Sequence, residues 1–182
     1  LPCTAALLTE RRNQIMALHP GRVFYTPGDN DWTDCDRTEI IQRFSELDRL
    51  DFLRHLFYDA PMSLPPEWLY ARQALFATVH LVSTNNGREE ILLSDVDLTL
   101  TLTDARDRAN YVWLSQAFIE AEKIGVNAVV IATQADVTHS KYKPRCTEER
   151  RQECDAFAGF SLHLRFLSAK FKKPVLLMHG DT

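Results

Sequence analysis

The sequence lacks the features that mark several large classes of protein. No stretch approaches 18 consecutive uncharged apolar residues, so we expect no membrane-spanning helix. Basic residues form no block, and 21 lysines and arginines against 25 acidic residues leave a net charge of −4, which disfavours a nucleic-acid-binding patch. Glycine is scarce, at 6 of 182 residues, and no glycine-rich phosphate loop occurs. The H-E-x-x-H and G-x-S-x-G motifs of zinc proteases and serine esterases are absent as well.

What is present is the composition of an ordinary globular domain. The chain is 45% hydrophobic and 25% charged, so its bulk is expected to fold. Its length predicts a single domain over residues 1–182. The chain begins without methionine and stops directly after an apolar run, so we expect it to be a fragment of a longer protein. The sequence does not indicate an oligomeric state.

Four cysteines, at Cys3, Cys35, Cys146 and Cys154, form no C-x-x-C pair. Two interpretations stay open. Bridges Cys3–Cys35 and Cys146–Cys154 are one of three possible pairings, and they would place the protein in an oxidising compartment, periplasmic or extracellular. The other interpretation is four buried free thiols in a cytosolic protein.

Four segments have the composition of β-strands and end at turn-forming residues. The third and fourth are nearly continuous apolar runs, which is typical of central strands covered on both faces. The predicted strands are residues 22–26, 77–83, 128–133 and 174–178.

Helical spacing of apolar residues lies between these strands. It predicts helices over residues 7–18, from Ser45 onward, over residues 107–123, and after Cys146, where apolar residues recur from Phe157 to Phe171. The helix–strand–helix–strand order of the second half predicts an α/β fold with some parallel strands.

Two further segments have weaker patterns. Alternating leucine and threonine over residues 99–103 predict an edge strand or an extended loop. Residues 136–147 have the composition of a solvated basic loop.

Polar side chains follow every predicted strand. Ligands of α/β sheets bind beyond the carboxyl ends of the strands, and carboxylate, amide and imidazole groups suit Mg²⁺, Mn²⁺, Ca²⁺ or Zn²⁺. The alternative is that these residues only terminate strands and build turns. The residues concerned are Asp29, Asn30, Asp31, Asn85, Asn86, Gln134, Asp136, His179 and Asp181.

The segment over residues 25–35 reads Tyr-Thr-Pro-Gly-Asp-Asn-Asp-Trp-Thr-Asp-Cys. It resembles the strand-end motif of the calcineurin-like metallophosphoesterases, and more closely a microbial branch in which the motif is Pro-Gly-Asp-Asn-acid-Trp-Thr-Asp-Cys. Residues 82–87 and 134–136 are similar to later strand ends of that family. Residues 179–182, His-Gly-Asp-Thr, look like the first four residues of its final His-Gly-Asp-Thr-His motif.

The resemblance implies a fold and an activity. The fold would be α/β with two packed mixed β-sheets flanked by helices, an αββα sandwich that is incomplete at its N-terminus. The activity would be hydrolysis of phosphate mono- or diesters by a metal-bound hydroxide. The cofactor would be a divalent metal, as two ions of Mn, Mg, Zn, Fe or Ca.

Residue roles follow from the same match. The matching residues are Asp29, Gln134 and Asp181 for the metal, Asn30 for catalysis, and Asn85, Asn86 and His179 for the substrate. In the wider family Asp29 replaces an asparagine ligand, and Asn30, Gln134 and Asp181 replace histidines. The added carboxylates favour hard cations, and Asn30 can donate a hydrogen bond to a phosphoryl oxygen but cannot supply a proton at neutral pH.

The replaced histidines also motivate two other interpretations. One is a non-catalytic extracellular binding or structural module on a degenerate metallophosphoesterase fold. The other is a calcium-stabilised adhesion-type domain, suggested by the oxygen-rich strand ends alone.

Overall fold

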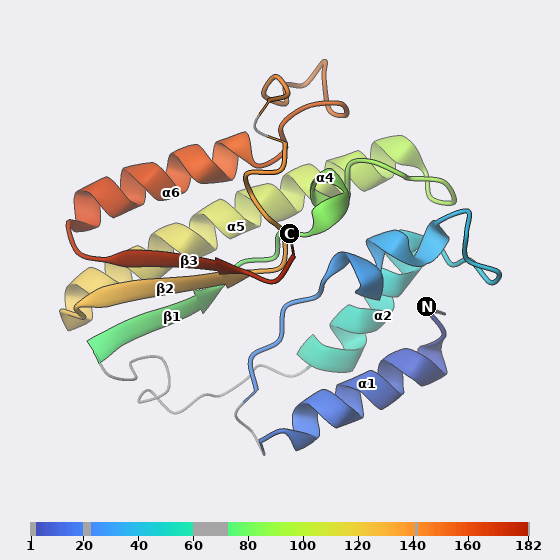
Figure 1. The fold of residues 1–182 in the computed structure, drawn as a ribbon, viewed down its shortest axis with the longest axis horizontal. Coiled ribbons are helices and arrows are strands. Elements are labelled where there is room, and N and C mark those ends of the chain that lie inside the picture. Colours follow the sequence, from blue (N-terminus) through green and yellow to red (C-terminus); the bar gives the residue numbers. More distant parts are fainter. Residues whose placement is uncertain (1–2, 20–22, 60–72, 141, 182) are drawn as a thin grey trace.

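A computed structural model describes residues 3–19, 23–59, 73–140 and 142–181. It is an α/β structure, as predicted, with helices and strands alternating through its second half (Figure 1). In chain order its elements are α1 (Ala5–Ala17), the 3₁₀ turns η1 (Asp29–Asp31) and η2 (Thr33–Asp36), α2 (Glu46–Tyr58), β1 (Ala74–Thr78), α4 (Ser83–Gly87), α5 (Val96–Ile124), β2 (Ala128–Thr133), α6 (Ala158–Phe171) and β3 (Val175–His179). None of the described helices is both long and apolar enough to cross a bilayer.

The described strands form one parallel sheet in the order β1-β2-β3. The predicted strand over residues 128–133 coincides with β2, that over 174–178 lies within one residue of β3, and that over 77–83 overlaps only the end of β1. The prediction of a two-sheet sandwich is not met in the described residues. Residues 23–26 of the predicted first strand are not in a strand, because no neighbouring strand among the described residues pairs with them.

Helices α5 and α6 cover one face of the sheet (Figure 1). The crossovers from β1 to β2 and from β2 to β3 step in the same direction, so both helices lie on the same side. Leu75, Val129 and Ile131 point into this core and meet Leu114 and Phe118 of α5. The stripe of α6 that completes the core is Phe160, Leu164, Leu167 and Phe171.

The opposite face of the sheet is open among the described residues. Phe76, Val130 and Leu176 share one register row on this face. Phe76 is 42% exposed, Leu176 is 54% exposed, and Met178 in the next row is 51% exposed. These apolar side chains therefore form an exposed surface on one face of the sheet, while the other face is packed against α5 and α6.

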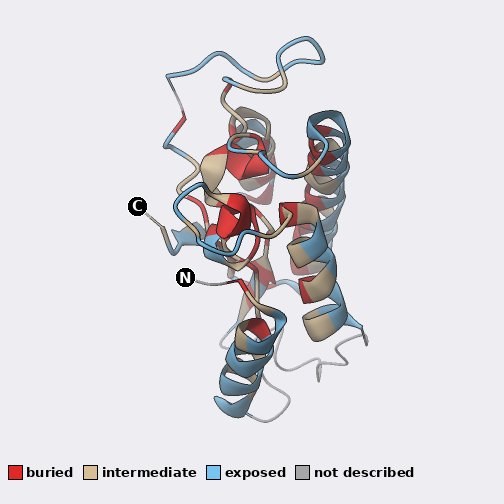
Figure 2. Ribbon diagram, turned by 90° about the vertical axis from the view of Figure 1, so that its right-hand side faces the viewer, coloured by how far each residue is buried: buried red, intermediate tan, exposed pale blue. Residues whose placement is uncertain are grey.

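The N-terminal half packs as a second, smaller core. Leu8 of α1, Leu53 of α2, Trp32 and Val82 are all buried together. Apart from Leu8 no residue of α1 is buried, and most of its surface faces solvent (Figure 2). A disulfide between Cys3 and Cys35 ties the start of α1 to η2.

The predicted disulfides are both formed. Cys3 bonds to Cys35 across 32 residues, and Cys146 bonds to Cys154 across 8 residues. The chain therefore holds one crosslink across a long loop and one across a short loop, and the interpretation with free thiols is wrong.

Local signals place the helix ends. Ser45 caps α2 by accepting a hydrogen bond from the backbone N–H of Asp48, and Gly125 ends α5 in the left-handed conformation. The prediction for residues 99–103 is wrong, because they belong to α5, which begins eleven residues before its predicted start at residue 107. Asp95 caps it there, and Leu100 and Thr103 face inward on its first turns.

Candidate functional site

The ends of the strands are held in register by backbone hydrogen bonds that continue past the sheet. The carbonyl of Gln134 accepts from the N–H groups of Gly180 (3.1 Å) and Asp181 (2.9 Å). The carbonyl of Leu81 accepts from the N–H of Ala135 at 3.2 Å. The segments after β1, β2 and β3 therefore meet at one edge, as a parallel sheet requires.

Three of the predicted site residues come together at this edge. The Gln134 amide Nε2 donates to the Asp29 carboxylate at 3.1 Å, while its Oε1 accepts from the backbone N–H of Ser83 at 2.8 Å. The Ser83 hydroxyl in turn donates to the Asp181 carboxylate. Asp29, Gln134, Ser83 and Asp181 thus form one connected chain of hydrogen bonds, which we call the strand-end cluster.

The segment over residues 25–35 brings Asp29 into this cluster. The carboxylate of Asp31 accepts from the backbone N–H of Gly28 and the Tyr25 hydroxyl, both at 2.9 Å, which closes the tight turn before η1. A Cβ atom on Gly28 would lie 3.1 Å from Cγ of Gln134. Glycine therefore allows the turn to approach β2 closely enough for Asp29 to reach Gln134.

A second carboxylate lies close to Asp29. Asp34 is buried, and its carboxylate contacts Arg37 at 3.0 Å and accepts from the Thr84 hydroxyl at 3.2 Å. Burial, followed by the negative charge of Asp29, raises the pKa of Asp34 to about 6 despite the opposing effect of Arg37. A bound cation would relieve the effect of the Asp29 charge on the Asp34 carboxyl.

Asn85 and Asn86 occupy an unusual turn. In α4 the residues Thr84, Asn85 and Asn86 have φ values of 57°, 52° and 59°, and Gly87 follows at 72°. This is one turn of left-handed helix, which costs about 1–2 kcal/mol for each residue other than glycine. Asparagine tolerates this conformation better than most residues.

The same turn directs both asparagine side chains into the protein. Asn85 donates to the Cys154 carbonyl at 2.8 Å and accepts from the Ser140 hydroxyl at 3.2 Å. Asn86 is fully buried and donates to the Asp107 carboxylate at 2.8 Å. The structure therefore places both amides away from the strand-end cluster and gives them structural partners, and their substrate-binding role stays a prediction.

The remaining predicted residues lie at the rim. The Asn30 side chain is exposed and curls back to donate to the Asp29 carboxylate at 3.2 Å. His179 is exposed, and its Nδ1 faces the carbonyl of Asp181.

A small cavity of about 90 Å³ adjoins the cluster and is lined by Ser83, Asp181, Asp136 and His139, among others. The pKa of Asp136 is lowered, because Thr138 donates its backbone N–H and its hydroxyl to that carboxylate. Asp136 therefore adds a persistent negative charge beside Asp181.

The sequence had not assigned roles to Ser83, Asp34 or His139. Asp34 is part of the recognised motif, which was the available signal for it. Ser83 lies just before Asn85 and Asn86 in the sequence. Its place in the strand-end cluster depends on the left-handed turn that follows it, which the sequence does not indicate.

The strand-end cluster contains the types of ligand atom that a hard cation prefers. Carboxylate, amide and hydroxyl oxygens are the groups that Mg²⁺, Mn²⁺ and Ca²⁺ prefer. Among the described residues, however, no three His, Cys, Asp or Glu side chains lie close enough to hold a metal ion together. The cluster therefore supplies part of a metal site, with the Gln134 amide between its two carboxylates.

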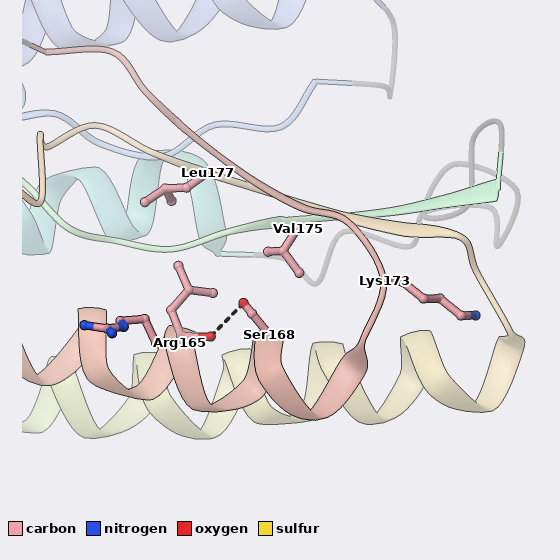
Figure 3. Close-up of a pocket in the computed structure, with 6 residues that line it drawn as sticks. Arg165, Ser168, Lys173, Val175 and Leu177 are labelled. Atoms are coloured by element: carbon pink, nitrogen blue, oxygen red, sulfur yellow. Dashed lines mark hydrogen bonds between the residues drawn. The ribbon is translucent and has the colours of Figure 1, made fainter.

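Another hollow, of about 410 Å³, lies between α6 and β3 and contains none of the predicted residues (Figure 3). Val175 and Leu177 point from β3 toward α6 in this view. Two of its polar groups have partners within the protein, since Ser168 donates to the Leu164 carbonyl and Lys173 to the Val126 carbonyl. We assign it no function.

Comparison with protein-family models, with curated proteins and with solved structures finds no match for this chain. Its function is therefore inferred from the strand-end cluster and from the motifs.

Proposed function

We propose that this chain belongs to a metal-dependent hydrolase of phosphate mono- or diesters of the calcineurin-like type. One observation carries the proposal: Asp29, Gln134 and Asp181, which match ligand positions of that family, lie in one hydrogen-bonded cluster at the carboxyl edge of a parallel sheet. They come from segments more than 40 residues apart in the sequence, so their meeting does not follow from local turn formation.

The cluster contributes negative charge and oxygen ligands to such a site. Asp29 and Asp181 would hold a divalent ion, with the Gln134 amide and the Ser83 hydroxyl beside it. A bound divalent ion would activate water and neutralise charge on the phosphoryl group, and two-ion sites do both. By the resemblance, further ligands would come from other family motifs, which residues 1–182 do not contain.

The exposed residues Asn30 and His179 would bind the phosphate ester. Asn30 is exposed beside Asp29 and would donate its amide N–H to a phosphoryl oxygen. It cannot protonate a leaving group at neutral pH, so esters with good leaving groups are the favoured substrates. His179 is an exposed imidazole at the same edge and would contact the substrate.

We also propose that a second sheet covers the open face of the described sheet. The exposed apolar row around Phe76 and Leu176 supports this, because a sheet face of that composition is normally buried against another layer. The covering strands would come from residues outside the described ones. Such a layer would complete the αββα sandwich expected from the motifs.

The two disulfides support a periplasmic or extracellular location. Structural disulfides persist in oxidising compartments and are rare in the cytosol. A fusion of the full natural polypeptide to a reporter that is active only outside the cytoplasm tests this point directly.

The activity is tested with the full natural polypeptide. Hydrolysis of p-nitrophenyl phosphate and of bis-p-nitrophenyl phosphate is measured with Mn²⁺, Mg²⁺ or Zn²⁺. We expect Asp29→Asn combined with Asp181→Asn to lower kcat at least 100-fold. The matched control is Asp48→Asn combined with Asp51→Asn, which removes the same charge from the exposed side of α2 and should leave kcat unchanged. Equal activity of the two double variants would refute this site.

One observation favours the second candidate, a non-catalytic module. Gln134 satisfies Asp29 and Ser83 with its own amide, so the cluster is internally hydrogen-bonded. Metal content of the purified protein separates the candidates. Less than about one ion per chain after dialysis against Mn²⁺, together with no turnover, favours the module.

A further inference from the structure

A cavity of about 580 Å³ lies between α2, α5, the end of β1 and the segment that precedes Gly28. This size is within the range of small-molecule sites, roughly 300–1,000 Å³. Its described lining residues include none of those in the strand-end cluster. They are Tyr25, Thr26, Pro27, Leu50, Leu53, Arg54, Tyr58, Thr78, His80, Leu102, Ala105, Arg106, Ala109 and Asn110.

One wall of the cavity is aromatic and aliphatic. Tyr25 stacks on Phe57 with ring centroids 3.9 Å apart, and Tyr58 donates its hydroxyl to the Tyr25 carbonyl at 2.8 Å. Leu50 and Leu102 continue this wall from α2 and α5. A flat or aliphatic group would be desolvated against these side chains.

The other wall carries an enclosed guanidinium without an ion pair. Arg106 donates from one terminal nitrogen to the backbone carbonyl and the side-chain oxygen of Asn86, and it lies over the ring of Trp32 at 5.1 Å. Its Nε is buried without a partner, and among the described residues no carboxylate forms a salt bridge with it. The neighbouring Asp107 pairs with Arg88 at 2.8 Å instead.

His80 is a second unsatisfied group in the same wall. Its Nε2 is buried and has no hydrogen-bond partner, and its ring meets Trp32 edge-on at 5.8 Å. Burial, and then the charge of Arg106, lowers the pKa of His80 to about 3, so the imidazole is neutral at physiological pH. Arg54 adds an exposed positive charge to the lining.

No acidic residue is among the described residues that line the cavity. The carboxylate of Asp31 accepts hydrogen bonds from the Tyr25 hydroxyl and the Gly28 backbone N–H. The carboxylate of Asp107, whose charge acts on Arg106, accepts hydrogen bonds from Asn86 and Arg88. A buried charge without a partner is costly, commonly by several kcal/mol. The cavity therefore combines an apolar wall with a guanidinium that has no salt bridge of its own among the described residues, and the carboxylate that acts on its charge, Asp107, is shared with Arg88.

We propose that this cavity binds a small organic anion, with an aromatic or aliphatic body against Tyr25, Leu50 and Leu102 and one carboxylate, sulfonate or phosphate group paired with Arg106. Guanidinium groups recognise such planar or tetrahedral oxyanions through paired hydrogen bonds. His80 and Arg54 would flank the anionic group. The site does not depend on the proposed hydrolase activity, because neither its residues nor its ligand requires a metal.

The test uses 2-naphthoate as the anionic probe and 2-naphthamide as its uncharged counterpart, with the full natural polypeptide. Isothermal titration calorimetry gives Kd, and chemical-shift changes of backbone amides locate the site. We expect 2-naphthoate to bind at least ten-fold more tightly than 2-naphthamide, with shifts confined to residues around the cavity. Raising the salt concentration should weaken binding of the anion but not of the amide.

Three variants and two controls make the test specific. Arg106→Gln should weaken 2-naphthoate binding at least ten-fold, and Arg54→Gln a few-fold. Arg106 also holds Asn86, so Ala109→Phe, which fills the cavity and leaves the charges in place, provides an independent test and should abolish binding. Arg108→Gln and Ala169→Phe, at exposed positions outside the lining, should bind like the natural protein.

Either of two results would overturn the proposal. One is equal affinity for 2-naphthoate and 2-naphthamide. The other is unchanged naphthoate binding in a folded Ala109→Phe variant. Loss of phosphatase activity would leave all these expectations intact, so the two proposals fail separately.

Discussion

The Cys3–Cys35 disulfide closes a loop of 32 residues, and its removal has a calculable effect on stability. A crosslink lowers the conformational entropy of the unfolded chain, and for 32 residues this amounts to about 3.7 kcal/mol. The same relation gives about 2.5 kcal/mol for the 8-residue Cys146–Cys154 loop. The longer loop should therefore stabilise the fold by about 1.2 kcal/mol more.

The perturbation is Cys3→Ala combined with Cys35→Ala, compared with Cys146→Ala combined with Cys154→Ala. Alanine avoids placing an unsatisfied hydroxyl at Cys35, which is fully buried. The free energy of unfolding is measured from urea transitions followed by far-ultraviolet circular dichroism. Equal m-values would show that the variants unfold between comparable states.

We expect the first pair of substitutions to lower the free energy of unfolding by at least about 3 kcal/mol, and the second pair by less. Loss of buried sulfur at Cys3 and Cys35 adds to the first value. A loss below about 1 kcal/mol for the first pair, or a larger loss for the second, would refute the loop-entropy reasoning.

Three further predictions concern the site and its support. Because burial raises the pKa of Asp34 from 3.8 to about 6, the folded state favours the protonated carboxyl; this contribution to stability is present below about pH 4 and is lost as the pH rises through 6. Asp34→Asn should therefore lose less stability than the natural chain between pH 4 and pH 7 in urea titrations, and an identical pH dependence would contradict the raised pKa. Gly87→Ala should lower Tm more than Gly125→Ala, since both positions have positive φ but only a Cβ at Gly87 meets other atoms, 3.1 Å from Trp32; equal shifts in calorimetry would show that this contact yields freely. Asn86→Ala should cost about 3 kcal/mol or more in urea unfolding, because it leaves buried partners unsatisfied within a left-handed turn, and a cost below 1 kcal/mol would count against that network.

The fold elements that could be predicted from the sequence are those with local signals. The β2 run and the helix start at Ser45 depend on residues within a few positions of each other, and both predictions are confirmed. Gly125 ends α5 by a local signal of the same kind. The strand predicted over residues 22–26 depends on a partner strand, which sequence composition alone does not supply. The alternation over residues 99–103 has the period of a strand, yet the Asp95 cap and the inward-facing Leu100 and Thr103 place it in α5.

Like the fold, the candidate site could be predicted from the sequence only in part. Asp29, Gln134 and Asp181 were expected to meet because parallel strands end at a common edge, and the structure brings them together. For Gln134 and Asp181 that reason is right, but Asp29 reaches the edge from the turn before η1 and not from a strand. Asn85 and Asn86 also follow a strand, but a left-handed turn directs their side chains inward. No periodicity in the sequence reveals that reversal, because it depends on backbone angles that asparagine and glycine permit without requiring.

The open face of the sheet has a practical consequence for handling the molecule. Phe76, Leu176 and Met178 are exposed beside the outer edges of β1 and β3, whose backbone groups on that side pair with no other described strand. Solvent-exposed apolar rows next to unpaired strand edges promote self-association. If no segment outside the described residues covers this face, the protein should self-associate as its concentration rises, and light scattering during purification would detect it.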